Sequence, residues 1–216
     1  AVGNTNTAAT QFTQAFDTKA PSLSITSDTT GTATGPVTYT FSFSEDVSGF
    51  SADHISVTGG SKQDGSFSGS GDTYSIVVTP TDDIQAGTIT VDVEAGVATD
   101  VAGNANTAAT QFSQAFDTQA PSLSISSDTT GTATGDVTYS FSFSENVSGF
   151  SADHITVAGG TKQDDSFSGS GDAYSIVVTP TEGDQGNIIV DVDAGVATDA
   201  VGNTNTAATQ FTQAFD

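Results

Sequence analysis

The chain has no cysteine, no methionine and no tryptophan, and only three of its 216 residues are basic: Lys19, Lys62 and Lys162. Without cysteine it can form neither a disulfide nor a thiolate metal site. The 26 acidic residues leave a net charge of −23. This charge opposes nucleic-acid binding, since that affinity comes largely from Lys and Arg contacts to phosphate. It also disfavours anionic membrane surfaces and attracts cations.

Long apolar runs and neighbouring histidines are also missing. All apolar runs are far shorter than the roughly 20 residues that span a bilayer, so we expect no direct membrane insertion. His54 and His154 hold the same position in two similar segments, so each segment has one histidine. Neither a nucleophilic triad nor a typical zinc site can be assembled from these residues. No tryptophan could hold a sugar beside a catalytic carboxylate pair. The sequence therefore predicts no enzyme.

Most of the chain is one sequence present twice. Residues 17–116 recur as residues 117–215 with about four positions in five unchanged. Residues 1–17 are identical to residues 200–216. We predict that residues 1–16 are the C-terminal strand remnant of a preceding repeat, followed by repeats at 17–116 and 117–216. Tandem arrays usually serve reach or multivalency rather than turnover. We expect residues 1–16 to be disordered or to pair with a neighbouring molecule's sheet edge.

Period-two hydrophobic patterns indicate strands throughout each repeat. In residues 37–44 (VTYTFSFS), Val37, Tyr39, Phe41 and Phe43 share one face while Thr and Ser take the other. Comparable segments, separated by Gly-rich turns, predict further strands at 22–26, 54–58, 64–68, 73–79, 88–94 and 110–116. No segment has sustained helical spacing. The predicted fold is all-β, with tandem immunoglobulin-like antiparallel β-sandwiches of about seven strands each.

The acidic residues of each repeat are predicted to gather at one end of its sandwich. Because the chain reverses at every loop, the loops after the second, fourth and sixth strands meet where the chain enters the repeat, beside its four-residue link. Carboxylates and amides there suit Ca²⁺, which takes six to eight oxygen ligands in irregular geometry. The candidate calcium ligands are Asp17, Glu45, Asp53, Asp100 and Asn104 in the first repeat, and Asp117, Glu145, Asp153, Asp199 and Asn203 in the second.

The position of this cluster at the junction between repeats favours a cation. Acidic residues at the far end of the first repeat face those of the second across the short link, and too few lysines are present to neutralise them. Calcium would remove this repulsion and stiffen the junction. An alternative remains open: Asp and Asn can serve as turn residues that bond their own backbone, and the excess charge can serve only solubility.

Three segments carry a resemblance to a known family: FSFSEDVSGFSADHISVTGG, TYSIVVTPT and VEAGVATDVAGNANTAA. They resemble the tandem bacterial immunoglobulin-like repeats of giant secreted RTX-type adhesins and biofilm-associated surface proteins of Gram-negative bacteria. The most specific piece is VATDxxGN, which contains Asp100, Gly103 and Asn104 and their counterparts Asp199, Gly202 and Asn203. The resemblance implies an extracellular location on the bacterial surface, export by a type I route and calcium near the domain junctions.

Together these features predict a structural extender that holds an adhesive domain away from the cell and supports attachment and biofilm formation. Its partners would be neighbouring repeats of the same chain in a monomeric array. Other cells or surface polysaccharide would be reached through other regions. The alternative is a module that itself recognises polysaccharide or associates with itself between cells. The two repeats differ mostly by mild changes, such as Asp46 against Asn146, which favours an extender over a tuned binding site.

Overall fold

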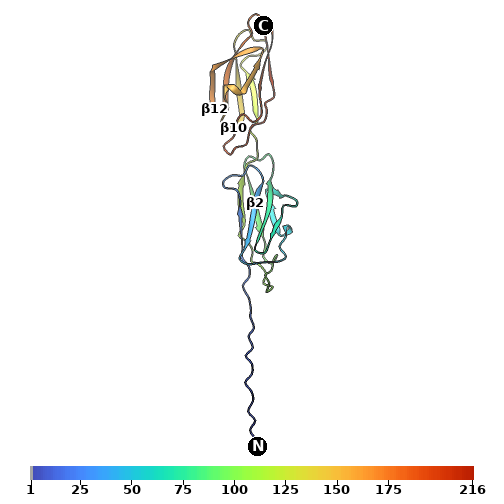
Figure 1. Cartoon of the computed structure of the whole chain (residues 1–216). Coiled ribbons are helices and arrows are strands. Elements are labelled where there is room, and N and C mark those ends of the chain that lie inside the picture. Colours follow the sequence, from blue (N-terminus) through green and yellow to red (C-terminus); the bar gives the residue numbers. More distant parts are fainter. Residues whose placement is uncertain (1) are drawn as a thin grey trace.

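The computed structural model describes residues 2–216 and shows two β-sandwiches stacked end to end (Figure 1). The first repeat contains β1 (Leu23–Ser27), β2 (Val37–Phe43), η1 (Ala52–His54), β3 (Ile55–Thr58), β4 (Gly60–Lys62), β5 (Ser68–Ser70), β6 (Thr73–Pro80), β7 (Gly87–Val93) and β8 (Phe112–Phe116). The second contains β9 (Leu123–Ser127), β10 (Val137–Val147), η2 (Ala152–His154), β11 (Ile155–Ala158), β12 (Gly160–Pro180), β13 (Gly186–Val192) and β14 (Phe211–Phe215).

Each repeat consists of two antiparallel sheets with the topology of an immunoglobulin domain. In the first repeat one sheet has the order β1-β2-β6-β4, with β5 also paired to β6, and the other has the order β3-β7-β8. The second repeat keeps this arrangement as β12-β10-β9 and β11-β13-β14. The all-β, immunoglobulin-like fold predicted from the sequence is therefore confirmed.

The core lies between the sheets and follows the predicted alternation. In β2 the residues Val37, Tyr39 and Phe41 are fully buried, and on the opposing sheet Ile89 and Val91 of β7 are equally inaccessible. The intervening threonines and serines of β2 face outward and are half-buried or exposed. Burial of such side chains, at about 25 cal/mol per Å² of apolar surface, supplies the main driving force for each sandwich.

One predicted strand is wrong in the first repeat. Residues 64–67 lie outside the strands there, and β5 begins only at Ser68. They form a turn in which the carbonyl of Gln63 accepts from the Ser66 N–H at 3.2 Å and from its hydroxyl at 2.7 Å. Gly65 within this turn has a φ of 72°, which glycine adopts readily. Strand pairing occurs on either side of the turn, in β4 and β5.

The link between the repeats is fastened to the first repeat. The Thr118 hydroxyl donates to the carbonyl of Thr81 at 2.8 Å and accepts from the N–H of Ile84 at 3.2 Å. The Thr118 N–H donates to the carbonyl of Ile84 at 2.9 Å. The Asp117 N–H donates to the carbonyl of Ala33 at 2.8 Å. The junction is therefore a packed contact rather than a free linker.

Residues 2–16 extend away from the first repeat as a single exposed stretch without strand pairing (Figure 1). Phe12 and Phe16 are 84% and 88% exposed, whereas Phe215, which matches Phe16 in sequence, is 5% exposed in β14. Ala1 lies outside the described residues, so the prediction that residues 1–16 are a strand remnant can be compared with the structure only for residues 2–16. Within residues 2–216, no helix has the length and apolar character that crossing a membrane requires.

A buried asparagine in each repeat holds the loop before the last strand. Asn205 is 2% exposed, and its side-chain oxygen accepts from the N–H groups of Val196 and Ala197 at 2.9 and 2.8 Å. Its amide nitrogen donates to the carbonyls of Asp193 and Thr206 at 3.0 and 2.9 Å. One side chain thus satisfies four backbone groups of a loop that has no regular secondary structure.

We expect Asn205→Ala to destabilise the second repeat by about 3 kcal/mol, because it leaves buried backbone groups without partners. Denaturant unfolding should then split into two transitions, since the first repeat keeps Asn106 in the same role. The control is Gln210→Ala on the exposed surface nearby, which we expect to change stability by less than about 0.5 kcal/mol. A single, unshifted transition for Asn205→Ala would contradict this role.

Candidate metal centre

The loop before the last strand presents an ionised carboxylate at the leading end of each repeat, meaning the end where the chain enters it. In the second repeat one oxygen of Asp199 accepts from the N–H groups of Val201, Gly202 and Asn203 at 2.8, 2.7 and 2.9 Å. Gly202 has a φ of 104°, which the turn requires and which L side chains rarely adopt. The other Asp199 oxygen accepts from the Asn203 amide at 2.8 Å.

These hydrogen bonds keep Asp199 charged. Burial acts to raise the pKa of Asp199, but the bonds from Asn203, Val201 and Gly202 outweigh it and hold the pKa below its usual value. In the first repeat the hydrogen bond from the Asn104 side chain likewise lowers the pKa of Asp100. The alternative interpretation, in which Asp and Asn serve as turn residues that bond their own backbone, therefore describes these loops correctly. The same hydrogen bonds also hold each carboxylate in position.

Three carboxylates converge at each leading end. In the first repeat Asp17, Glu45 and Asp100 each place an oxygen within 4.8 Å of the other two. In the second repeat Asp117, Glu145 and Asp199 do the same. An ion about 2.4 Å from each ligand would separate opposite oxygens by about 4.8 Å, so this spacing fits a single Ca²⁺.

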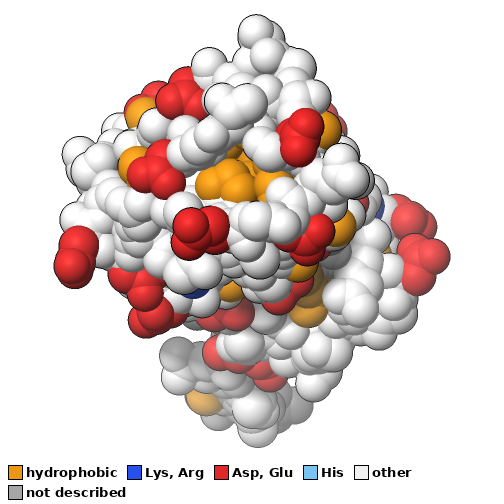
Figure 2. Space-filling model, turned by 90° about the horizontal axis from the view of Figure 1, so that it is seen from above, with side chains coloured by type: hydrophobic (Ala, Val, Ile, Leu, Met, Phe, Trp, Pro, Cys, Tyr) orange, Lys and Arg blue, Asp and Glu red, His pale blue; other side chains and the backbone are white. Residues whose placement is uncertain are grey.

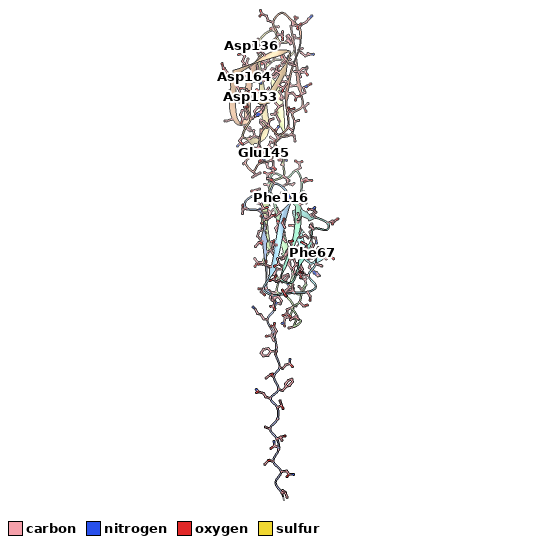
Figure 3. All side chains as sticks on the ribbon, in the orientation of Figure 1. Phe67, Phe116, Asp136, Glu145, Asp153 and Asp164 are labelled. Carbon is pink, nitrogen blue, oxygen red and sulfur yellow. The ribbon has the colours of Figure 1, made fainter. Side chains whose placement is uncertain are left out.

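The second cluster is less solvated than the first. Asp117 and Asp199 are 9% and 6% exposed, whereas Asp17 is an exposed residue in the first cluster. Glu145 lies at the seam between the two sandwiches (Figure 3), and its Oε1 is buried with no hydrogen-bond partner. A buried carboxylate oxygen without a donor is unfavourable unless a cation or an ordered water meets it.

The environment of Glu145 favours its neutral form. Burial raises the pKa of Glu145 most, and the negative charges of Asp199 and Asp117 raise it further. The side chain of Gln85, from the first repeat, lies close enough to act in the opposite direction and lower the pKa of Glu145. Lys62 and Lys162 do not neutralise the cluster, because their ammonium groups donate to the backbone carbonyls of Ala52 and Ala152.

The predicted ligands do not all meet. Asp53 and Asp153 lie in η1 and η2, where both are exposed, and neither belongs to a cluster; Asp153 stands apart from Glu145 in Figure 3. A short 3-10 turn places them on the flank of the sandwich rather than at its end. Asn104 and Asn203 do reach the clusters, where their amide nitrogens donate to the aspartates. In this orientation they position the carboxylates.

Gln85 was not a candidate in the sequence. It belongs to the loop between β6 and β7, at the trailing end of the first repeat, where the chain leaves it. Nothing in the sequence marks this residue, because its contact depends on how the two repeats stack. All three carboxylates of the second cluster come from the second repeat and its link, so the first repeat contributes cover and an amide rather than acidic ligands.

A sandwich of this topology, repeated in tandem, defines an immunoglobulin-like structural module. A family model described as bacterial Ig-like domain matches residues 17–116 and again residues 117–215. The matches cover well over half of the chain, so the chain belongs to this family. A comparison with curated proteins finds no match. Domains of this family are typically non-enzymatic structural modules found outside the cell or on its surface.

The raised pKa of Glu145 predicts how stability depends on pH when calcium is chelated. The folded state holds the Glu145 proton more tightly than the unfolded state, so this residue's contribution to stability falls as pH rises from the ordinary glutamate range through the raised pKa. Glu145→Gln removes this loss, and we expect it to raise the melting temperature at neutral pH and to have a smaller effect in acid.

Thermal melts of the chelated protein across this pH range measure the effect. Glu45→Gln is the matched control in the first cluster, which no preceding repeat covers, and should change the melting temperature less. A lower melting temperature for Glu145→Gln at neutral pH would contradict an unfavourable buried charge at this position.

Proposed function

We propose that these repeats are extender modules of a large bacterial cell-surface adhesin of the RTX type and that calcium at the leading end of each repeat stiffens the junctions. Such an array would hold an adhesive domain away from the cell and support attachment and biofilm formation. The observation that carries the proposal is the cluster of Asp117, Glu145 and Asp199 at the seam between the repeats. Both aspartates are buried there, and the ammonium groups of Lys62 and Lys162 are bonded elsewhere.

The chemistry of the cluster favours a hard dication. All three side chains offer oxygen, and a buried oxygen of Glu145 has no donor. Calcium accepts such ligands together with backbone carbonyls and water, and it tolerates irregular geometry. Bound there, the ion would neutralise the charges that Asp117 and Asp199 impose on Glu145, and it would favour the ionised form of all three carboxylates.

The architecture supports a mechanical role. The repeats stack end to end, and the link is held by hydrogen bonds rather than left free (Figure 1). Because the cluster lies at the same seam, ion binding would act on the relative orientation of the two sandwiches. Before export, where calcium is scarce, the seam would lack this support and the chain would be easier to keep unfolded.

Calcium should stabilise the protein through the cluster. Extracellular modules bind calcium with dissociation constants of about 0.1–1 mM, and calcium at about one hundred times that value would add roughly 2.7 kcal/mol to the free energy of unfolding. Calorimetric titration and thermal melts with and without a chelator measure the effect. We expect Asp117→Asn to lose most of the gain and Asp153→Asn, outside the cluster, to keep it. If chelation leaves the melting temperature of the native sequence unchanged, the calcium site is refuted.

Thr118→Ala should loosen the junction without unfolding either repeat, because it removes two hydrogen bonds worth about 1 kcal/mol each. Small-angle scattering should show a broader distribution of end-to-end dimensions. Thr18→Ala is the matched control, since Thr18 is at the same position in the first link and makes no such bond among the described residues. An unchanged scattering profile for Thr118→Ala would argue against a rigid extender held by this link.

A further inference from the structure

Each repeat buries a glutamine that takes no part in the carboxylate clusters. Gln114 in β8 is 5% exposed, and Gln213 in β14 is 6% exposed. A buried amide needs hydrogen-bond partners, and those of Gln114 lie more than 80 residues away in the sequence. Its amide nitrogen donates to the carbonyl of Gly31, and its side-chain oxygen accepts from the Ser27 hydroxyl at 3.1 Å. The glutamine therefore joins the last strand of the repeat to the segment that follows the first strand.

The same two parts of the chain also meet through the backbone. Ala33 and Phe116 form a parallel bridge, and each is 3% exposed. The Ala33 N–H donates to the carbonyl of Ala115 at 2.9 Å, and the Asp117 N–H donates to the carbonyl of Ala33 at 2.8 Å. The bridge is isolated, because Ala33 lies outside the named strands. The Gln114 side chain thus adds hydrogen bonds beside a short backbone contact.

We infer that the Gln114 side chain and the bridge at Ala33 form a mechanical clamp that resists stretching of the first repeat, and that Gln213 and the bridge at Ala133 do the same in the second. The inference rests on the proposed extender function for the source of the tension. It does not depend on calcium.

The direction of the clamped segments supports this inference. The chain enters a repeat at its leading end and leaves it at its trailing end, so tension along the array acts along the strands (Figure 1). The segment at residues 27–33 and β8 run in the same direction, since the bridge between them is parallel. Tension draws the first segment toward the leading end and β8 toward the trailing end. The bonds between them are therefore loaded together in shear, and they must break together before β8 can slide.

Loss of these bonds would open the sandwich. β1 pairs with β2 in one sheet and β8 pairs with β7 in the other, so the mechanical clamp connects the two sheets. Sliding of β8 would also draw Phe116 out of the core. Its ring lies so close to Gly87 of β7 that a Cβ at this glycine would overlap it. The clamp therefore protects the burial on which the fold depends.

The second repeat has the same contacts. The Gln213 amide donates to the carbonyl of Gly131, and its side-chain oxygen accepts from the Ser127 hydroxyl at 2.9 Å. The Ala133 N–H donates to the carbonyl of Ala214 at 2.8 Å. The mechanical clamp thus occurs once in each repeat, which gives an experiment an internal reference.

The charge of the molecule assigns the load to single chains. Figure 2 views the molecule along its long axis and shows many acidic side chains and few basic ones on the visible face. With a net charge of −23, copies lying side by side repel one another when no cation is bound. Tension would then act on bonds within each repeat.

Stretching of single molecules at constant force tests the clamp. The full chain has no cysteine, so Ala1→Cys and a cysteine added after Asp216 provide the two attachment points. Calcium is chelated throughout, so failure of the clamp and failure of the calcium proposal are separate results. Forced unfolding follows the unfolding rate rather than equilibrium stability. The native sequence should show two unfolding steps with similar rates, one for each repeat.

We expect Gln114→Ala to raise the unfolding rate of the first repeat about thirtyfold at the same force, as for the loss of two hydrogen bonds, and to leave the second repeat unchanged. The matched control is Asn106→Ala, which also removes a buried amide. Asn106 bonds only groups within residues 94–107. Its loss should lower equilibrium stability but change the forced rate less than about twofold, because bonds outside the clamp are still intact in the transition state.

Ser27→Ala provides a second variant that keeps Gln114 in place. It removes one hydrogen bond of the clamp, and we expect it to raise the forced unfolding rate about fivefold. It decides the question by itself if Gln114→Ala does not fold. The inference is overturned if the folded clamp variants change the rate less than about twofold, or if Asn106→Ala raises it as much as they do.

Discussion

Three carboxylates meet at the junction between the two repeats, and no lysine of the described residues is bonded to them. Asp117, Glu145 and Asp199 converge where one sandwich meets the next, and the ammonium groups of Lys62 and Lys162 are occupied by backbone carbonyls elsewhere. Burial strengthens the mutual repulsion because little water remains to screen it. The sandwiches supply the ends on which these carboxylates are held.

The scaffold keeps the charges in place by local means. Asp199 is held by three backbone N–H groups and the Asn203 amide, so it cannot readily rotate away from Glu145. A site whose ligands are already fixed loses little conformational entropy when an ion binds. When no ion is bound, burial raises the pKa of Glu145 most, and the fixed negative charges of Asp199 and Asp117 raise it further. The fixed positions of the carboxylates would therefore favour ion binding, and the same positions keep the charges close together when no ion is bound.

The sequence predicted the fold well because each strand buries one face. Alternation in residues 37–44 placed Tyr39 and Phe41 in the core, and both are fully buried. It failed at residues 64–67 of the first repeat, where a turn containing Gly65, with a φ of 72°, interrupts the strand that is continuous in β12 of the second repeat. Strand order alone brought Asp17, Glu45 and Asp100 to one end, but it could not distinguish them from Asp53. That distinction requires the 3-10 turn η1, whose geometry depends on backbone bonds such as His54 N–H to Ser51 carbonyl.

The residues that form the contact between the two repeats could not be predicted from the sequence. The loop between β6 and β7 contains Gln85 and Ile84, and these residues meet Glu145 and Thr118 of the next repeat and its link. The corresponding loop of the second repeat is one residue shorter and has Asp184 where the first has Ile84.

The seam between the two repeats is therefore built from two parts. The following repeat supplies the carboxylates, which are the same in both copies, and the preceding repeat supplies a variable loop that covers them. Because the sandwich cores do not depend on that loop, changes in it can alter how each junction is covered without altering the fold or the charge cluster.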